Sequence, residues 1–466
     1  MLTYNHSIMQ KRPNILFLLI DDLGWRDLAC YGSEFYETPF IDSLQEGGVT
    51  FTSAYAASPV CSPTRASIMT GKYPARLGIT NYIGGRERGK LLPPANLEYL
   101  PLTEKTLPRA LQEAGYKTYH VGKWHLGGGP YLPQYQGFNR NLAGCEWGAP
   151  RHGYFSPYRI PGFEDGPEGE FLTDRLTDEA IKLIKESPEP FFMYLSHYAV
   201  HAQAAAPERY VRKYQDKVKR LGLDRVKTFE EGEYFPCDHK KHLRVVRRLV
   251  QSDPVYAGMI ENLDENIGRL LQTLKETGKL NHTIIIFTSD NGGLSTAEGS
   301  HTCNLPLSEG KGWMDEGGIR VNLIIRWPGV TDRKGRQVCS VPVVSTDFYP
   351  TILEMAGLPL LPQQHMDGVS LAPLLQGKEK IDRENIFFHF PHYGNQGGQP
   401  TSSLIADGYK LIEYYEDNRL KLFHLQEDIG EKNNLVEKEP TRLKQLKAML
   451  TEMKRATAAK LPVADR

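Results

Sequence analysis

Short apolar runs, each followed at once by polar residues, recur along most of the chain. They are long enough for buried strands and too short for typical helices, and they lie at residues 14–20, 117–121, 191–195, 284–288 and 321–327. Segments with helical periodicity or helix start and stop signals alternate with them, at residues 106–114, 173–185, 254–279 and 346–355. Runs without polar positions are typical of parallel strands covered on both faces. The alternation therefore predicts an α/β fold, with a large central, mostly parallel β-sheet sandwiched by helices.

The pattern changes around residues 365–376. Short β-type runs follow at residues 386–390, 403–405, 409–415 and 420–425. The last amphipathic segment carries an apolar stripe of Leu443, Leu446, Leu450 and Met453. These features predict a smaller C-terminal α+β subdomain, made of an antiparallel sheet with one helix against it. We therefore expect a large N-terminal domain over residues 13–365 and the subdomain over residues 366–466.

Composition excludes several classes of protein. Lysine plus arginine and aspartate plus glutamate both number 56, so the formal net charge of +0 argues against bulk binding to nucleic acid or to an anionic membrane. The six cysteines are scattered without a Cys-x-x-Cys pair, which disfavours a zinc site and a disulfide scaffold. No apolar run approaches the ~18 residues that span a bilayer. Residues 1–12 lack the apolar core of a signal peptide, which leaves two possibilities: a cytoplasmic protein, or an exported one whose signal is missing from this sequence.

Two of the predicted strands end in clusters of oxygen ligands. Asp21 and Asp22 follow the run at 14–20, and Asp290 and Asn291 follow the run at 284–288. In open α/β sheets, sites form outside the carboxyl ends of the strands. A single Asp-Asp pair would usually be a solvated turn, but its recurrence at a second strand end favours a shared site. A donor set made of oxygens alone suits Ca²⁺ or Mg²⁺ rather than zinc.

The segment from Cys61 to Gly71 predicts a loop that turns into a helix. Pro63 fits the first turn of a helix, and Gly71 fits its end. Cys61 would then lie at the helix N-terminus, where unpaired N–H groups favour negative charge, and Arg65 would lie about one turn further on. The alternative is a small buried cysteine ahead of an ordinary helix. The segment alone leaves both interpretations open.

The longer pattern from Cys61 to Pro74, Cys-Ser-Pro-Thr-Arg-Ala-Ser-Ile-Met-Thr-Gly-Lys-Tyr-Pro, resembles the signature of the formylglycine-dependent sulfatases. The blocks at 21–39 and 423–435 also resemble this family, and the likeness covers most of residues 13–435. It implies the alkaline-phosphatase-like fold. It also implies a partner, either a formylglycine-generating enzyme or an anaerobic sulfatase-maturing enzyme, which oxidises Cys61 to 3-oxoalanine (formylglycine). The hydrated aldehyde then serves as the nucleophile.

The resemblance also implies roles for individual residues. The expected ligands of Ca²⁺, which it favours over Mg²⁺, are Asp21, Asp22, Asp290, Asn291 and the modified Cys61. The expected catalytic residues are Cys61, Arg65, Lys123, His125, His201, Asp290 and Lys311. Asp290 would assist deprotonation of the diol that Arg65 and His125 hold. Lys123 and Lys311 would bind the sulfate, and His201 would protonate the departing oxygen. Gln203 and the three alanines after it depart from the family pattern, which often has a proline soon after this histidine.

Substrate contacts are expected mainly from residues 140–171, which are rich in Gly, Pro, Trp and Tyr and have no clear period. The candidates are Glu146, Trp147, Arg151, His152, His301 and His392, with ordinary loop packing as the alternative for each. The whole chain resembles bacterial polysaccharide O-sulfatases, which implies a sulfated glycan as the substrate. The best match is to enzymes acting on sulfated galactose or N-acetylgalactosamine, with O4 as the candidate position. The resemblance also implies a periplasmic or secreted protein.

Two other functions fit the same motif. A phosphonate monoester or phosphodiester hydrolase can use the same nucleophile. A non-catalytic sulfoglycan-binding protein would result if Cys61 were never oxidised. The intact oxygen set and both lysines argue against the second alternative.

Overall fold

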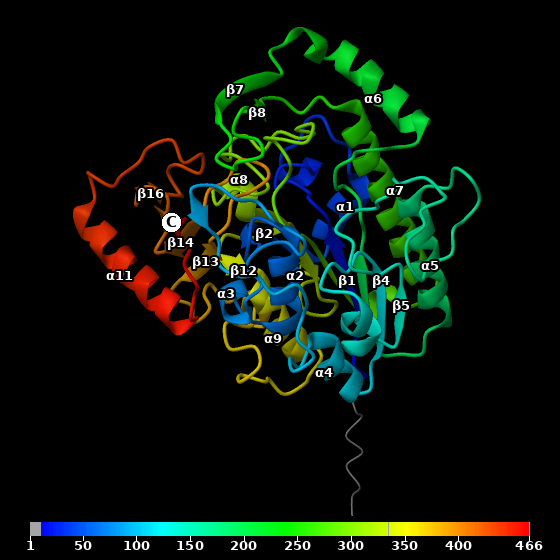
Figure 1. The fold of residues 1–466 in the computed structure, drawn as a ribbon. Coiled ribbons are helices and arrows are strands. Elements are labelled where there is room, and N and C mark those ends of the chain that lie inside the picture. The colour runs from blue at the N-terminus through cyan, green and yellow to red at the C-terminus, as the bar shows by residue number, and fades with distance from the viewer. Residues whose placement is uncertain (1–10, 334, 466) are drawn as a thin grey trace, which may run out of the picture.

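The computed structural model describes residues 11–333 and 335–465, and a nine-stranded sheet forms its centre (Figure 1). The strands run in the order β11-β2-β10-β9-β1-β6-β4-β5, with β12 paired to β2. Their bounds are β1 Asn14–Ile20, β2 Gly48–Tyr55, β4 Lys117–Gly122, β5 Arg140–Leu142, β6 Phe191–Ser196, β9 Thr283–Ser289, β10 Arg320–Arg326, β11 Gln337–Cys339 and β12 Val343–Val344. Strands β9, β1, β6, β4 and β5 are parallel, and β10 is antiparallel to both of its neighbours. The expected mostly parallel sheet is confirmed.

Helices cover both faces of this sheet. In β1, Leu16, Leu18 and Ile20 belong to one hydrophobic core, and the alternate residues of the strand belong to another. The first core includes α1 (Pro39–Asp42), α5 (Leu172–Glu186) and α7 (Pro254–Glu276). The second includes α2 (Cys61–Thr70), α4 (Leu107–Glu113), α9 (Phe348–Met355) and α10 (Ala372–Leu375). Because both faces are covered, every residue of β1 is buried, which explains its continuous apolar run.

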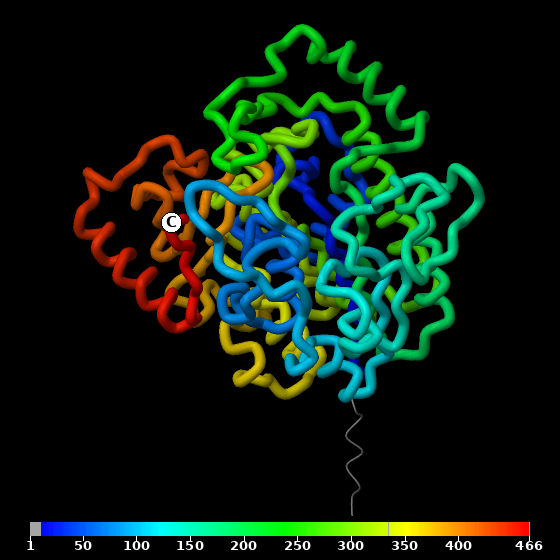
Figure 2. The backbone as a smooth tube through the Cα atoms, in the orientation of Figure 1, coloured from blue at the N-terminus to red at the C-terminus, as the bar shows by residue number. Residues whose placement is uncertain are grey.

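A second, smaller sheet follows in the chain, as expected. Its antiparallel strands run in the order β13 (Ile386–Phe390), β14 (Thr401–Ala406), β15 (Tyr409–Tyr414) and β16 (Leu420–His424). Helix α11 (Pro440–Ala456) packs on it through Leu446 and Leu450. The chain then returns to the main body, where β17 (Val463–Ala464) pairs with β3 (Leu91–Leu92), as the red and light-blue segments of Figure 2 show.

Five further α-helices and strands belong to the described part of the chain. They are α3 (Pro74–Leu77), α6 (Glu208–Arg220), β7 (Phe229–Tyr234), β8 (Arg244–Arg248) and α8 (Glu316–Ile319). Strands β7 and β8 form a hairpin that lies with α6 at the top of Figure 1. Within the described part of the chain, no helix combines the length and the apolar character needed to cross a bilayer.

Candidate active site

Cys61 is the first residue of α2, and the local sequence explains why the helix starts there. The backbone of Val60 is extended, and the Thr64 hydroxyl bonds the backbone N–H and carbonyl of Ser58, both at 3.2 Å. Gly71 ends the helix with φ 67°, a left-handed conformation that suits glycine. The thiol of Cys61 is therefore held at the N-terminus of a buried helix, in a side chain that is 3% exposed.

Three carboxylates converge on Cys61. The Cys61 Sγ and one oxygen each from Asp21, Asp22 and Asp290 lie within 4.8 Å of one another. Strands β1 and β9 are parallel neighbours whose last residues, Ile20 and Ser289, are paired in register. Their acidic exits therefore lie side by side at the carboxyl end of the sheet. The structure thus brings together the two strand ends that the sequence singled out.

Each carboxylate has a cationic partner of its own. Arg65 Nε donates to Asp290 Oδ2 at 2.8 Å, and Nη2 of the same guanidinium lies 2.8 Å from that oxygen as an ion pair. Lys123 Nζ donates to both oxygens of Asp21, at 2.8 and 2.7 Å. The third pair joins Lys311 Nζ to Asp22 Oδ2 at 2.7 Å. All six side chains are buried, so these pairs compensate charges that would otherwise be costly to bury.

The pairs also set the protonation of the site. Burial opposes ionisation of Asp290, but Arg65 and Lys123 lower its pKa below the usual value. Burial would likewise lower the pKa of Lys311, but the nearby carboxylate of Asp22 raises it well above the usual range. Asp21 is different, because burial raises its pKa to about 8 in spite of Lys123. The site thus combines Arg65 and Lys311, which stay charged, with carboxylates crowded against one another.

His125 lies beside Cys61 with one ring nitrogen open to hydrogen bonding. Its Nε2 is 3.0 Å from the carbonyl oxygen of Ile83, which can only accept, so Nε2 carries the proton. Burial lowers the pKa of His125 well below its usual value, so the ring is neutral and Nδ1 is an acceptor. Within the described residues, Nδ1 has no hydrogen-bond partner. Gly148 packs against the ring so closely that a Cβ there would lie 2.6 Å from Cε1.

His201 is tied to Lys311. Its Nδ1 hydrogen-bonds the carbonyl oxygen of Ala202, and its Nε2 lies 2.9 Å from Lys311 Nζ and 3.6 Å from Asp22 Oδ2. Since a carbonyl only accepts, Nδ1 carries a proton and Nε2 accepts from the lysine. Lys311 therefore bridges a carboxylate of the acidic cluster and the histidine at the cavity surface.

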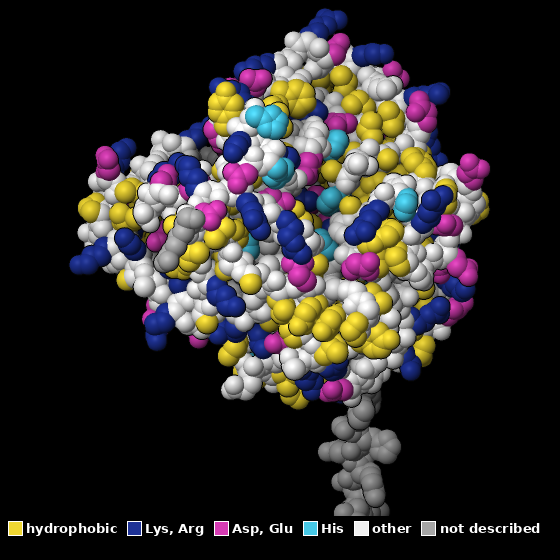
Figure 3. All heavy atoms as spheres, viewed as in Figure 1, with side chains coloured by type: hydrophobic (Ala, Val, Ile, Leu, Met, Phe, Trp, Pro, Cys, Tyr) yellow, Lys and Arg dark blue, Asp and Glu magenta, His cyan; other side chains and the backbone are white. Residues whose placement is uncertain are grey.

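A cavity of about 310 Å³ opens above these groups, at the low end of the range for small-molecule sites. It is lined by Val60, Cys61, Tyr82, Ile83, Gly84, His125, Gly148, Ala149, Arg151, His201, Glu298, Lys311, Asn395 and Gln396. Figure 3 shows histidine, lysine and arginine side chains around a hollow near the middle of one face. Tyr82, Glu298 and Gln396 are not predictable from the sequence, because they stand in loops and belong to no recognisable motif.

Of the six predicted substrate contacts, Arg151 lines this cavity and the other five do not. Trp147 packs against Arg151, whose guanidinium lies 5.0 Å from the centroid of the indole ring. The ring of His152 lies 5.9 Å from the same indole. Glu146 lines a separate cavity. Two other histidines are engaged elsewhere: His301 Nδ1 is 2.9 Å from Asp253, and His392 Nε2 is 2.8 Å from Thr80.

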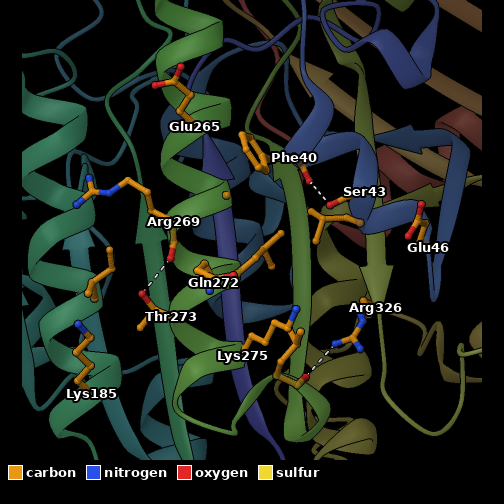
Figure 4. Close-up of a pocket in the computed structure, with 15 residues that line it drawn as sticks. Phe40, Ser43, Glu46, Lys185, Glu265, Arg269, Gln272, Thr273, Lys275 and Arg326 are labelled. Carbon is orange, nitrogen blue, oxygen red and sulfur yellow. Dashed lines mark hydrogen bonds between the residues drawn. The ribbon is translucent and has the colours of Figure 1, made fainter.

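A larger hollow of about 1040 Å³ lies on the helical face formed by α1, α5 and α7 (Figure 4). Its lining includes Phe40, Glu265, Arg269 and Lys275. It extends towards Arg326, the last residue of β10, and therefore away from the strand ends that carry the acidic cluster. No cysteine or histidine lines it among the described residues, so the smaller cavity is the one with reactive groups.

The donor set of the acidic cluster fits a hard divalent cation. Asn291 Nδ2 donates to Asp22 Oδ1 at 2.8 Å, which turns the amide towards the cluster. Its Oδ1 is buried and has no hydrogen-bond partner among the described residues, an arrangement that is costly unless another group binds it. Carboxylate and amide oxygens are the ligands that Ca²⁺ and Mg²⁺ prefer.

Comparisons with known proteins agree with this geometry. Residues 13–358 match the Sulfatase family model, and residues 309–458 match a model described as N-sulphoglucosamine sulphohydrolase, C-terminal. A sulfatase of Formosa agariphila is 31% identical, covering 92% of this chain and 86% of that protein. Human arylsulfatase A is 30% identical, and the match covers 83% of this chain and 72% of that protein. The N-acetylgalactosamine-6-sulfatase of Canis lupus familiaris is 32% identical, and the match covers 81% of this chain and 68% of that protein.

A solved structure is similar over nearly the whole chain. The crystal structure of Ps i-CgsB in complex with k-i-k-neocarrahexaose superposes with a TM-score of 0.75 at 26% identity, covering 96% of this chain and 93% of that one. The expected resemblance and the alkaline-phosphatase-like fold are thus confirmed. The chain belongs to the sulfatase family and is a sulfuric ester hydrolase.

Proposed function

We propose that the protein removes O-sulfate from a sulfated carbohydrate, with galactose or N-acetylgalactosamine sulfate in a polysaccharide or host glycan as the substrate. The observation that carries the proposal is the meeting of three carboxylates with Cys61, which lines a small cavity. The carbohydrate part is supported by the similarity to N-acetylgalactosamine-6-sulfatase and to a protein that binds a neocarrahexaose. The sulfate is at O4 or O6, since the sequence favours the first position and the name of the relative gives the second.

The nucleophile and the metal ion follow from the family and from the donor set. A formylglycine at position 61 supplies, in its hydrated form, an attacking hydroxyl and a second hydroxyl through which sulfate is released. A Ca²⁺ ion held by Asp21, Asp22, Asp290 and Asn291 supplies positive charge next to it. The oxidation of Cys61 requires a formylglycine-generating or anaerobic sulfatase-maturing enzyme as a partner.

The residues around position 61 orient and deprotonate the nucleophile. The open Nδ1 of His125 accepts a hydrogen bond from a hydroxyl at position 61 and thereby sets its direction. Arg65 keeps the carboxylate of Asp290 ionised, so Asp290 can take a proton from the hydroxyl at position 61. Lys123 keeps both of its short contacts on Asp21 and orients that carboxylate. Direct binding of sulfate by Lys123 stays a prediction.

Lys311 and His201 act on the ester itself. Lys311 stays charged and lines the cavity, so it binds sulfate oxygens. Its contact with His201 Nε2 lets the pair pass one proton to the sugar oxygen as the S–O bond breaks. Proton donation of this kind is worth roughly 10²–10⁴ in rate.

The test is to express the protein with a maturation enzyme and to analyse the Cys61 peptide by mass spectrometry. We expect an aldehyde at position 61, together with desulfation of at least one compound in a panel of galactose and N-acetylgalactosamine 4- and 6-sulfates. Cys61→Ala is the matched control and should be inactive. An intact thiol in protein that still binds sulfated glycans would instead indicate a binding protein. Faster turnover of aryl phosphonate esters than of aryl sulfates would indicate a phosphonate hydrolase.

A further inference from the structure

One acidic side chain lines the Cys61 cavity. Glu298 is the acidic residue among those that form its wall, while Lys311, Arg151 and the two histidines supply positive or neutral groups. A sulfate ester is an anion, so a carboxylate beside it raises the energy of the complex unless it is matched by donors. None of the catalytic roles assigned above uses Glu298. Glu298 is therefore a candidate for binding the part of the substrate that lies outside the sulfate group.

The carboxylate of Glu298 is held in place by neighbouring amides. Asn395 Nδ2 donates to Oε1, and Gln396 Nε2 lies 3.3 Å from Oε2. Asn395 is fixed in turn by the His239 ring at 3.0 Å and by Lys240 Nζ, 2.9 Å from its carbonyl oxygen. An ionised carboxylate accepts about four hydrogen bonds, so these two amides leave acceptor capacity for another ligand.

The opposite charge reaches the cavity from a different part of the sheet. Glu298 follows β9, whereas Arg151 follows β5, and the strands β1, β6 and β4 separate these two in the sheet. The Arg151 guanidinium stacks on Trp147, and no carboxylate pairs with it among the described residues. The wall of the cavity is therefore polarised, with an acceptor group from one side of the site and a cationic donor group from the other.

We infer that Glu298 is a specificity-determining residue that accepts hydrogen bonds from free hydroxyl groups of the sulfated sugar. A hydroxyl donates a proton to a carboxylate, whereas a second sulfate group has no proton to donate and is repelled. The cavity thus selects a sugar that carries free hydroxyl groups, and no second sulfate, on the side facing Glu298. The inference rests on the proposed function, because it assumes a carbohydrate ester.

The experiment compares Glu298→Gln with the wild-type enzyme on two classes of ester. Glutamine keeps the size of the side chain but removes its charge, and the residue is exposed at the rim, so folding is preserved. We expect kcat/KM to fall about tenfold or more, mainly through KM, on the monosulfated sugar that the wild type hydrolyses best. On 4-nitrophenyl sulfate, which has no sugar hydroxyls, kcat/KM should stay within about twofold. The rate on N-acetylgalactosamine 4,6-disulfate should rise relative to the monosulfated sugar.

Glu230→Gln is the matched control, because Glu230 is an exposed carboxylate on β7, paired with Lys227 at 3.4 Å and outside the cavity. This substitution should leave kcat/KM unchanged on the monosulfated sugar, the disulfated sugar and 4-nitrophenyl sulfate. An equal loss on the sugar and the aryl ester in Glu298→Gln, or no loss on the sugar, would overturn the inference. A wild-type enzyme that hydrolyses 4-nitrophenyl sulfate but none of the sulfated sugars would overturn the proposed function instead.

Discussion

Each buried carboxylate beneath Cys61 is matched by a particular cation, and this pairing determines what a single substitution does. Removing one partner of a buried ion pair typically costs 3–5 kcal/mol, because the other charge is left uncompensated. Substitutions at Asp21 or Lys123 therefore mix losses of stability with losses of activity. Asn291 is more informative, since it is uncharged and its Oδ1 has no partner among the described residues.

Asn291→Ala should weaken calcium binding while the protein still folds. The substitution removes the amide oxygen that we propose as a ligand, and we expect the apparent Kd for Ca²⁺ to rise about tenfold or more. The measurement is the shift of Tm as Ca²⁺ is added to chelator-treated protein, because an ion that binds the folded state stabilises it by RT ln(1 + c/Kd), where c is the free Ca²⁺ concentration.

Asn322→Ala is the control for that experiment. Asn322 is also fully buried, but its amide donates to the Trp25 carbonyl at 2.6 Å, whereas the amide of Asn291 donates to Asp22. It should lower Tm without changing the response to Ca²⁺. Equal calcium responses in the two variants would show that Asn291 is not a ligand.

Among the elements, those predicted correctly are the ones whose pattern is set by burial alone. Strand β13 runs over Ile386–Phe390, as its apolar run predicts, because each of its residues is buried. Strand β14 is longer than the predicted 403–405, since the hydroxyl of Ser402 is buried against His389 and makes the sequence look polar. The helix predicted at 346–355 begins at Phe348, because the preceding residues form a tighter 3₁₀ turn.

The acidic cluster of the site could be predicted from the sequence, because it also depends on buried strands. Asp21 and Asp290 stand directly after apolar strands, so their convergence follows from the parallel pairing of β1 and β9. The contact between Glu298 and Asn395 at the rim of the cavity could not be predicted, because the two residues lie far apart in the sequence and meet only in the folded chain. His392 was predicted as a substrate contact, but its ring bonds Thr80 and does not line the cavity.

The contact between α7 and α1 should make stability depend on pH. Asp264 of α7 accepts from the backbone N–H groups of Ile41 at 2.7 Å and Phe40 at 3.2 Å, at the start of α1. Burial raises the pKa of Asp264 to about 7, above its ordinary value of 3.8. The folded state therefore keeps a proton that the unfolded state loses. The stability contributed by this group is complete below about pH 4 and is lost as the pH rises to 7.

Asp264→Asn removes that titration. At pH 5 the variant should be less stable than the wild type by about 1 kcal/mol, the usual effect of a weakened helix cap, and the difference should shrink at pH 8. Thermal unfolding at both pH values measures it. Asp253→Asn is the control, since its contact with His301 lowers the pKa of Asp253 although burial opposes this. That variant should lose about the same stability at pH 5 and at pH 8, because a carboxyl group with a lowered pKa is ionised at both. Parallel behaviour of the two variants would contradict the argument.

At the scale of the whole molecule, a buried charge network joins the two sheets. Lys410 of β15 lies 3.0 Å from Glu316 of α8 and 2.8 Å from Glu431, and Glu316 also accepts from Arg320 of β10 at 2.6 Å. The C-terminal segment also reaches the cavity through Asn395 and its neighbour. The C-terminal region therefore contributes to the active site as well as to stability, whereas the division at residues 365 and 366 stays a prediction.

Lys410→Met tests how far the two sheets depend on this network. The variant leaves two carboxylates buried without their shared cation, and we expect the free energy of unfolding to fall by about 3–5 kcal/mol. Lys421→Met on the neighbouring strand β16 is the control, because Lys421 is 32% exposed and lies 3.9 Å from Asp315. A partly exposed pair of this kind contributes at most about 1 kcal/mol. The measurement is urea unfolding of both variants, together with the activity that each retains. It shows whether the buried network contributes more to stability than the partly exposed pair. Similar losses in both would mean that apolar packing, rather than the buried charges, holds the small sheet against the large one.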